Sequence, residues 1–263
     1  MQKLPAGQID QFISQGFVKI ENAFPAGLAD ECRAILWKAT GCNPDHPETW
    51  TQPVLRIGEL GSEPFRKAAN TRILHTAFDQ LVGRDNWLPR ETLGSFPIRF
   101  PNQNPAGDTG WHVDASFPGD DATNYLSWRI NIRSRGRALL MLFLFSDVSE
   151  DDAPTIISIG SHRDVARILQ PEGEKGLGFM ELAERLQGLP ERERCLATGK
   201  AGTVYLCHPF LAHAAQDHRG TNPKFMAQPP LLPRRDFAFD PRVRKLCPVE
   251  IAILGGVGEP GSF

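Results

Sequence analysis

The sequence predicts a mainly β protein with flanking helices, whose core is a jelly-roll or a barrel. After Gly83, short apolar runs alternate with clusters of Pro, Gly, Asn and Asp, and the chain of 263 residues contains 24 Gly and 22 Pro. Such alternation is typical of antiparallel strands joined by turns. The eight runs that we expect to form strands are Leu93–Phe100, Trp111–Ala115, Tyr125–Ile132, Ala138–Phe145, Thr155–Ile159, Thr203–Cys207, Leu211–Ala215 and Phe225–Leu231.

Helices are expected before this core and within it, because apolar residues recur there at helical spacing. In the N-terminal flank we expect helices at Gln8–Gln15, Ala26–Thr40 and Glu63–Val82, a strand at Phe17–Ile20 and a long loop over residues 41–64. We expect a single domain over residues 1–263. It divides into a mostly helical flank at 1–83, the core at 84–232 with a helical insertion at about 164–190, and a C-terminal extension at 233–263.

Composition and charge exclude several classes of protein. A content of 41% apolar and 23% charged residues is ordinary for folded proteins, and a net charge of −2 argues against nucleic-acid binding by bulk electrostatics. The longest apolar run, Ala138–Phe145, is too short to span a membrane. The first residues, MQKLPAGQIDQF, lack the apolar centre of a signal peptide, so we expect a cytoplasmic protein.

The segment Gly110-Trp111-His112-Val113-Asp114 contains a candidate metal site. Residues i and i+2 of a strand point to the same side, so His112 and Asp114 would direct an imidazole and a carboxylate to one point. These are two of the three ligands of a 2-His-1-carboxylate iron site. The alternative is a surface histidine beside a turn aspartate.

Two later histidines compete for the third ligand position. His208 and His213 lie five residues apart and would face opposite sides of an ideal strand, but Pro209 predicts a turn, so strand parity does not decide between them. Each is followed eleven positions later by a basic residue, Arg219 or Lys224. Such a cation on the next strand would hold the far carboxylate of a dicarboxylate cosubstrate. The alternative for either cation is a solvated surface position.

Taken together, these segments resemble the phytanoyl-CoA dioxygenase family of Fe(II)- and 2-oxoglutarate-dependent oxygenases. The resemblance spans about residues 8–232 and rests on the order and spacing of seven segments, QFISQGFV, WHVD, FSDV, DAPT, GSHR, GTVYLCHPFLAHAA and NPKF. It implies a double-stranded β-helix core, which is a cupin-like jelly-roll. It also implies Fe(II), 2-oxoglutarate and O2 as cofactor and cosubstrates.

The resemblance assigns roles to individual residues. It makes His112, Asp114 and His213 the iron ligands and leaves His208 a supporting role. It places the 2-oxoglutarate cation at Lys224, where the family usually has arginine. The family often has serine at the position of Ala215, so one hydrogen bond to the cosubstrate is missing there. The candidate polar groups that compensate are Thr155 and Arg99.

The implied enzyme is a dioxygenase that hydroxylates or otherwise oxidises a small organic substrate, with release of succinate and CO2. Because Asp114 fills the position that halogenating relatives leave open, the resemblance favours hydroxylation or a related oxidation, such as desaturation or ring formation, over halogenation. Two alternatives are a cupin-like isomerase or hydrolase that uses another divalent ion, and an inactive β-barrel binding module. An arginine-lined mouth would suit an anionic substrate, although the same arginines could be solvated; they are Arg129, Arg133, Arg135 and Arg137.

Overall fold

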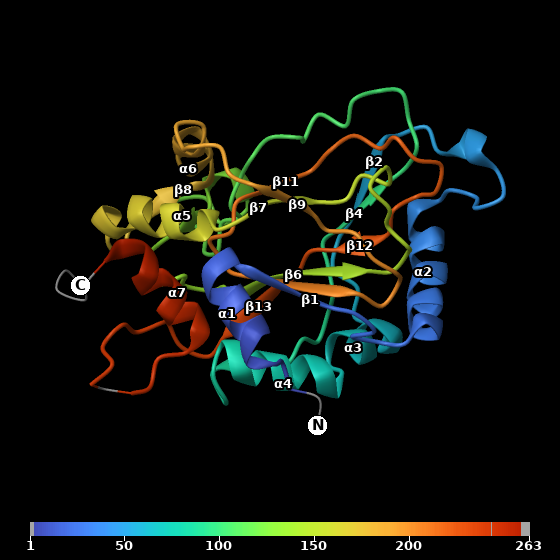
Figure 1. The fold of residues 1–263 in the computed structure, drawn as a ribbon. Coiled ribbons are helices and arrows are strands. Elements are labelled where there is room, and N and C mark those ends of the chain that lie inside the picture. Colours follow the sequence, from blue (N-terminus) through green and yellow to red (C-terminus); the bar gives the residue numbers. More distant parts are fainter. Residues whose placement is uncertain (1–2, 243, 259–263) are drawn as a thin grey trace.

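Two antiparallel sheets form the centre of the structure, a computed structural model that describes residues 3–242 and 244–258 (Figure 1). The larger sheet has the order β1 (Phe17–Ile20), β10 (Val204–Cys207), β6 (Leu139–Leu144), β13 (Pro230–Pro233) and β3 (Trp87–Leu88), and β12 (Met226–Ala227) also pairs with β6. The smaller sheet has the order β11 (His213–Ala214), β7 (Ile156–Ser158) and β9 (Arg194–Leu196). Two further strand pairs are β2 (Val54–Ile57) with β4 (Phe96–Arg99), and β5 (Arg129–Ile130) with β8 (Leu177–Gly178).

Two isolated backbone pairings extend these sheets. Arg99 at the end of β4 pairs with Lys224, two residues before β12, and His112 pairs with His213 at the edge of the smaller sheet. The chain thereby brings segments that are more than 100 residues apart in sequence into direct contact. These two pairings are also where the predicted site residues meet.

Strand β6 is buried on both faces and separates two apolar clusters. Leu140, Leu142 and Leu144 belong to a cluster with Ile157 of the smaller sheet. The alternate residues Leu139, Met141 and Phe143 belong to the cluster formed with the helices. Because successive side chains of a strand point to opposite faces, one continuous apolar run supplies both cores.

The helices are α1 (Ala6–Gln15), α2 (Ala26–Thr40), α3 (Glu63–Ala69), α4 (Arg72–Leu81), α5 (Ser161–Leu169), α6 (Phe179–Leu186) and α7 (Pro248–Val257), with 3-10 turns η1 (Pro47–Thr49), η2 (Tyr125–Ser127) and η3 (Gln170–Glu172). In Figure 1, α1, α4 and α7 lie on the side of the larger sheet away from β7 and β9. Among the described residues, no helix combines the length and apolar character needed to cross a membrane.

The fold confirms antiparallel sheets with flanking helices, but it is mixed helix and sheet rather than mainly β. The predicted helix Glu63–Val82 is two helices, because the Thr71 hydroxyl accepts a hydrogen bond from the backbone N–H of Leu74 at 3.4 Å and so begins α4 separately. The predicted loop over 41–64 contains β2, which is ordered by its pairing with β4. The predicted strand Trp111–Ala115 is reduced to the single pairing at His112.

Further differences lie in short elements. The predicted strand Tyr125–Ile132 begins as the 3-10 turn η2 and continues as β5. Strand β9 and helix α7 were not predicted from the sequence. Strand β9 has only three residues, and its order depends on pairing with β7. Such tertiary contacts are not visible in local propensity.

Two buried histidines, His162 at the start of α5 and His208 after β10, pack against each other with ring centroids 4.9 Å apart. The Nε2–H of His162 donates to the Ile13 carbonyl at 3.1 Å and that of His208 to the Val249 carbonyl at 3.3 Å. Burial lowers the pKa of His162 to about 4, and burial together with His162 lowers the pKa of His208. Both rings are therefore neutral in the folded protein near pH 7.

We expect acid to destabilise the fold through this pair. The unfolded chain takes up a proton on each histidine below about pH 6.5. In the folded chain His162 resists protonation until about pH 4, and the pKa of His208 is also lowered, so stability is complete above about pH 6.5 and falls as the pH drops. His162 alone should remove about 2 kcal/mol from the free energy of unfolding between pH 7 and pH 5. Urea unfolding at several pH values measures this slope. His162→Gln should reduce the slope and His46→Gln, at an exposed position, should not; an equal slope in both variants would contradict the prediction.

Candidate metal centre

Three side chains from two distant segments meet at the edge of the smaller sheet. One ligand atom each from His112, Asp114 and His213 lies within 4.8 Å of the others. Asp114 Oδ1 is 3.8 Å from His112 Nε2 and 3.9 Å from His213 Nε2. The backbones of the two histidines hold this arrangement, since each N–H donates to the carbonyl of the other residue, at 3.0 Å and 2.9 Å.

Backbone hydrogen bonds orient both imidazole rings. The Nδ1–H of His112 donates to the Gly110 carbonyl at 2.9 Å, and the Nδ1–H of His213 donates to the Leu211 carbonyl at 3.0 Å. A carbonyl accepts only, so each ring carries its proton on Nδ1 and leaves an electron pair on Nε2. Burial, and next the neighbouring His112, lower the pKa of His213 to about 4 and keep the ring neutral.

The ring nitrogen His213 Nε2 is buried and has no hydrogen-bond partner among the described residues. Leaving a buried acceptor unpaired costs free energy, and a metal ion is a partner that would remove this cost. Two neutral imidazoles and one carboxylate also form a donor set that suits a divalent transition metal. The residues present therefore fit an iron site.

Asp114 is held in its ionised form by its neighbours. Its Oδ2 lies 3.2 Å from Arg137 Nη1, and the Tyr125 hydroxyl donates to its Oδ1 at 3.5 Å. Burial alone would raise the pKa of Asp114, but Arg137 and then the two imidazoles outweigh burial and lower it. The sequence did not indicate these roles for Arg137 and Tyr125, because the residues lie 23 and 11 positions from Asp114 and meet it only in the fold.

The structure separates the two competing histidines. His208 is buried away from the three groups; its ring packs against Phe12 with centroids 6.1 Å apart, and its Nδ1 accepts a hydrogen bond from the Phe210 N–H at 3.1 Å. His213 is the histidine that the fold places beside His112 and Asp114. Of the two candidate cations, Arg219 is exposed and Lys224 is fully buried.

Lys224 and Arg99 form a second buried cluster. Their backbones pair through two hydrogen bonds of 3.0 Å and 2.8 Å. The Lys224 ammonium donates to the Ala153 carbonyl, while Arg99 Nη2 donates to both oxygens of Asp108 at 2.8 Å and 2.7 Å. Arg99 Nη1 is buried without a hydrogen-bond partner among the described residues. Burial and the charge of Arg99 lower the pKa of Lys224 well below its usual range, against the opposing effect of Asp108.

This second cluster carries more positive than negative charge, because Asp108 also pairs with Arg56. Buried cations without enough counter-charge are costly unless an anion completes the site. The cluster is linked to the metal-site residues through β7. Lys224 contacts Ala153, which lies shortly before β7, and β7 pairs with β11, which contains His213. Thr155 lies in the chain between Ala153 and β7. It is buried, and its hydroxyl donates to Met226 Sδ at 3.7 Å.

The arginines that could have formed a charged mouth have other partners. Arg129 donates to the carbonyls of Lys175 and Gly176 at 2.9 Å and 2.7 Å. Arg133 pairs with Glu174, Arg135 lies over the ring of Phe117, and Arg137 pairs with Asp114. These contacts favour structural roles for the four side chains over an anion-binding mouth.

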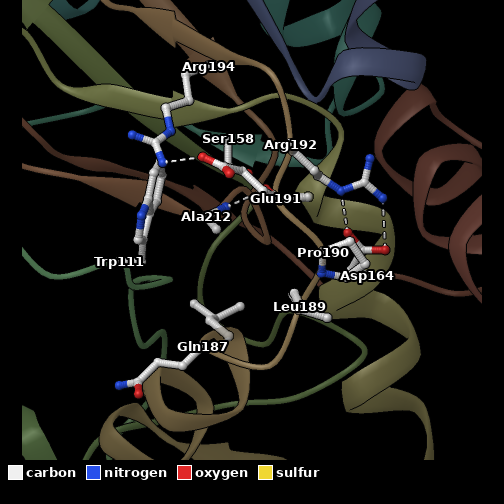
Figure 2. A pocket seen from close by; sticks show the side chains of 12 residues that line it. Trp111, Ser158, Asp164, Gln187, Leu189, Pro190, Glu191, Arg192, Arg194 and Ala212 are labelled. Carbon is white, nitrogen blue, oxygen red and sulfur yellow. Dashed lines mark hydrogen bonds and ion pairs between the residues drawn. The ribbon is translucent and has the colours of Figure 1, made fainter.

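A pocket of about 360 Å³ adjoins the segments that contain the grouped histidines, and Figure 2 shows the side chains that line it. Trp111 and Ala212 line it, and each directly precedes one of the grouped histidines, so they point to the opposite face. Its charges are already paired, because Arg192 donates to Asp164 and Arg194 to Glu191 (Figure 2). Arg194 also lies over the Trp111 ring, 5.7 Å from its centroid. The pocket therefore backs the site and does not contain it.

Comparison with known proteins identifies the family. The family model described as phytanoyl-CoA dioxygenase (PhyH) matches residues 12–226. A search of curated protein sequences gave no match.

Several solved structures share the fold. The carbocyclase SnoK from nogalamycin biosynthesis is 15% identical, with a TM-score of 0.58 over 92% of this chain and 87% of its own. The epimerase SnoN, solved with Fe3+, alpha ketoglutarate and nogalamycin RO, is 17% identical, with a TM-score of 0.55 over 84% and 80%. HygX from Streptomyces hygroscopicus, solved with nickel, 2-oxoglutarate and hygromycin B, is 19% identical, with a TM-score of 0.53 over 86% of each chain. With the family model matching most of its length, the chain belongs to the phytanoyl-CoA dioxygenase family.

Proposed function

We propose that this protein is a non-haem Fe(II)- and 2-oxoglutarate-dependent dioxygenase that hydroxylates, or otherwise oxidises, a small organic substrate. The observation that carries the proposal is the grouping of His112, Asp114 and His213 with an unpartnered, buried Nε2 on His213. Two histidines and one carboxylate on one side of a metal leave coordination positions open for a cosubstrate and O2. Bound iron would supply O2 activation coupled to decarboxylation of 2-oxoglutarate to succinate and CO2.

Each of the three proposed ligands is supported by a neighbour. The carbonyls of Gly110 and Leu211 fix the tautomers of His112 and His213. Arg137 keeps Asp114 ionised and leaves its Oδ1 facing the two imidazoles. Such partners increase the basicity of ligands and limit their rotation, so the site is organised before a metal binds.

We further propose that Lys224 binds the far carboxylate of 2-oxoglutarate, with Arg99 and Thr155 beside it. The support is the burial of two basic side chains side by side and the Nη1 of Arg99, which has no hydrogen-bond partner among the described residues. Lysine offers a compact charge in place of the two parallel hydrogen bonds of arginine. The buried guanidinium of Arg99 is therefore the group suited to add directional donors.

The strand pairings support a double-stranded β-helix core. The Arg99–Lys224 pairing adds β4 beside β12 and β6, and the His112–His213 pairing adds a fourth segment beside β11, β7 and β9. The neighbours solved with iron or nickel and 2-oxoglutarate are consistent with this proposal. Since the neighbours include an epimerase and a carbocyclase, the oxidation outcome is the part of the proposal that needs a substrate to test.

The test is O2-dependent formation of succinate from 2-oxoglutarate by the Fe(II)-loaded protein. We expect slow turnover without substrate, and no turnover without Fe(II) or O2. An isomerase or hydrolase would bind metal without forming succinate, and an inactive binding module would not bind 2-oxoglutarate. Either result would overturn the proposal.

A further inference from the structure

Large apolar side chains are exposed beside the metal-site residues. Among residues 3–242 and 244–258, the large hydrophobic residues classed as exposed are Tyr125, Leu126, Met180 and Ile251. Three of these four lie on η2 and the first turn of α6, with Leu126 exposing 55% and Met180 60% of its surface. Exposed apolar groups gathered in one place are typical of a binding surface.

Aromatic contacts connect this surface to the proposed ligands. The Phe179 ring lies 5.7 Å from the His112 ring, and the Tyr125 ring lies 5.6 Å from Phe179 and 5.6 Å from Trp128, between centroids. We call Tyr125, Leu126, Trp128, Phe179 and Met180 the aromatic rim. The rim borders the side of Asp114 that faces the two imidazoles, because the Tyr125 hydroxyl reaches Oδ1 of that carboxylate.

The rim offers apolar contact and the hydroxyl of Tyr125. The arginines beside the rim are engaged. Arg137 lies 3.2 Å from Asp114 and donates to the Ala115 carbonyl at 3.1 Å. Arg129 has its Nε and Nη2 bound to backbone carbonyls and lies 3.8 Å from Glu181. The hydroxyl of Tyr125 makes only long contacts, 3.5 Å to Asp114 and 3.4 Å to the Ala115 carbonyl. A good hydroxyl donor bond is nearer 2.7–2.8 Å. The hydroxyl is therefore available to donate to an oxygen of a bound molecule.

We propose that the aromatic rim binds the substrate, and that the substrate is an uncharged ring compound with an acceptor oxygen. This inference rests on the proposed oxygenase function. Stacking on Phe179 and Tyr125 would place a ring at the opening beside His112, because aromatic pairs favour centroid separations of 4.5–7 Å. A hydrogen bond from Tyr125 to the acceptor oxygen would fix its orientation there.

Two fluorescent probes that share a ring system test the charge preference. N-phenyl-1-naphthylamine is neutral, and 8-anilinonaphthalene-1-sulfonate carries a sulfonate. We expect the neutral probe to bind the Ni(II)- and 2-oxoglutarate-loaded full chain more tightly than the anionic probe, in fluorescence titrations. Tighter binding of the anionic probe would overturn the inference.

Matched variants locate the binding. Met180→Ser and Ile251→Ser each remove an exposed apolar side chain from a helix, but only Met180 belongs to the rim. Phe179→Ala should lower the affinity for the neutral probe about tenfold. Met180→Ser should lower it severalfold, and Ile251→Ser should leave it unchanged. Tyr125→Phe should weaken the binding of 1-naphthol, measured by its competition with the neutral probe, and should leave the affinity for the neutral probe unchanged. Equal affinities for the Met180 and Ile251 variants would overturn the inference even if Phe179→Ala failed to fold.

Failure of this inference is distinguishable from failure of the proposed function. Metal and 2-oxoglutarate affinities are measured by calorimetry on the same samples, and the probes are also titrated into metal-free protein. If metal and 2-oxoglutarate bind but the rim variants do not affect the neutral probe, the substrate class is wrong and the oxygenase proposal stands. If neither binds, the oxygenase proposal fails, and with it the assignment of the rim to a substrate.

Discussion

Replacing His213 by alanine should abolish metal binding while the protein remains folded. The change removes one of three proposed ligands, and even the loss of a group that only supports a ligand costs 10–100-fold in metal affinity. We therefore expect a loss of at least about 100-fold for Fe(II). Anaerobic calorimetric titration measures the affinity, and circular dichroism checks the fold.

His208→Ala is the matched control for this prediction. His208 is buried and hydrogen-bonded but lies outside the grouped ligands. We expect this variant to bind Fe(II) normally in its folded fraction, with a free energy of unfolding lower by roughly 1–3 kcal/mol, because buried partners are left unpaired. A metal-free His208→Ala together with a metal-binding His213→Ala would show that the distal ligand is misassigned.

Lys224→Met should remove 2-oxoglutarate binding and at the same time stabilise the cosubstrate-free protein. Breaking a buried charge pair costs roughly 2 kcal/mol or more, so we expect at least about a thirtyfold loss of 2-oxoglutarate affinity. Without the anion, Lys224 is a buried amino group whose charged form is disfavoured by burial and by the guanidinium of Arg99. An apolar side chain of similar length avoids that cost and should raise the free energy of unfolding by about 1 kcal/mol or more.

Metal affinity separates this effect from damage to the whole site. Lys224→Met should bind Fe(II) as the unchanged protein does, because Lys224 is not among the three grouped ligands. Arg219→Met, at an exposed position, should change neither affinity. Normal 2-oxoglutarate binding by Lys224→Met would contradict the role proposed for this lysine.

The sequence predicted the His112 and Asp114 pair because residues two positions apart point to the same side of an extended chain. The two side chains do lie together in the structure, although the run Trp111–Ala115 forms a single backbone pairing, at His112, and does not extend into a strand. The choice between His208 and His213 was not available from parity. The N–H of Leu211 donates to the His208 carbonyl at 2.9 Å, so the chain turns between the two histidines.

Other site features depend on contacts that local sequence does not contain. Asp108 and Arg137 act on residues 9 and 23 positions away, and only the fold brings them together. The partners of Arg129 are backbone carbonyls at residues 175 and 176, which no charge pattern reveals. For the same reason the sequence suggested a charged mouth, whereas in the structure those arginines have other partners.

The crystal structure of the anaerobic Fe(II) and 2-oxoglutarate complex tests the central claim most directly. We expect iron bound to Nε2 of His112, Nε2 of His213 and Oδ1 of Asp114, with the far carboxylate of 2-oxoglutarate on Lys224 and Arg99. Iron bound to His208, or a far carboxylate away from both Lys224 and Arg99, would contradict the account.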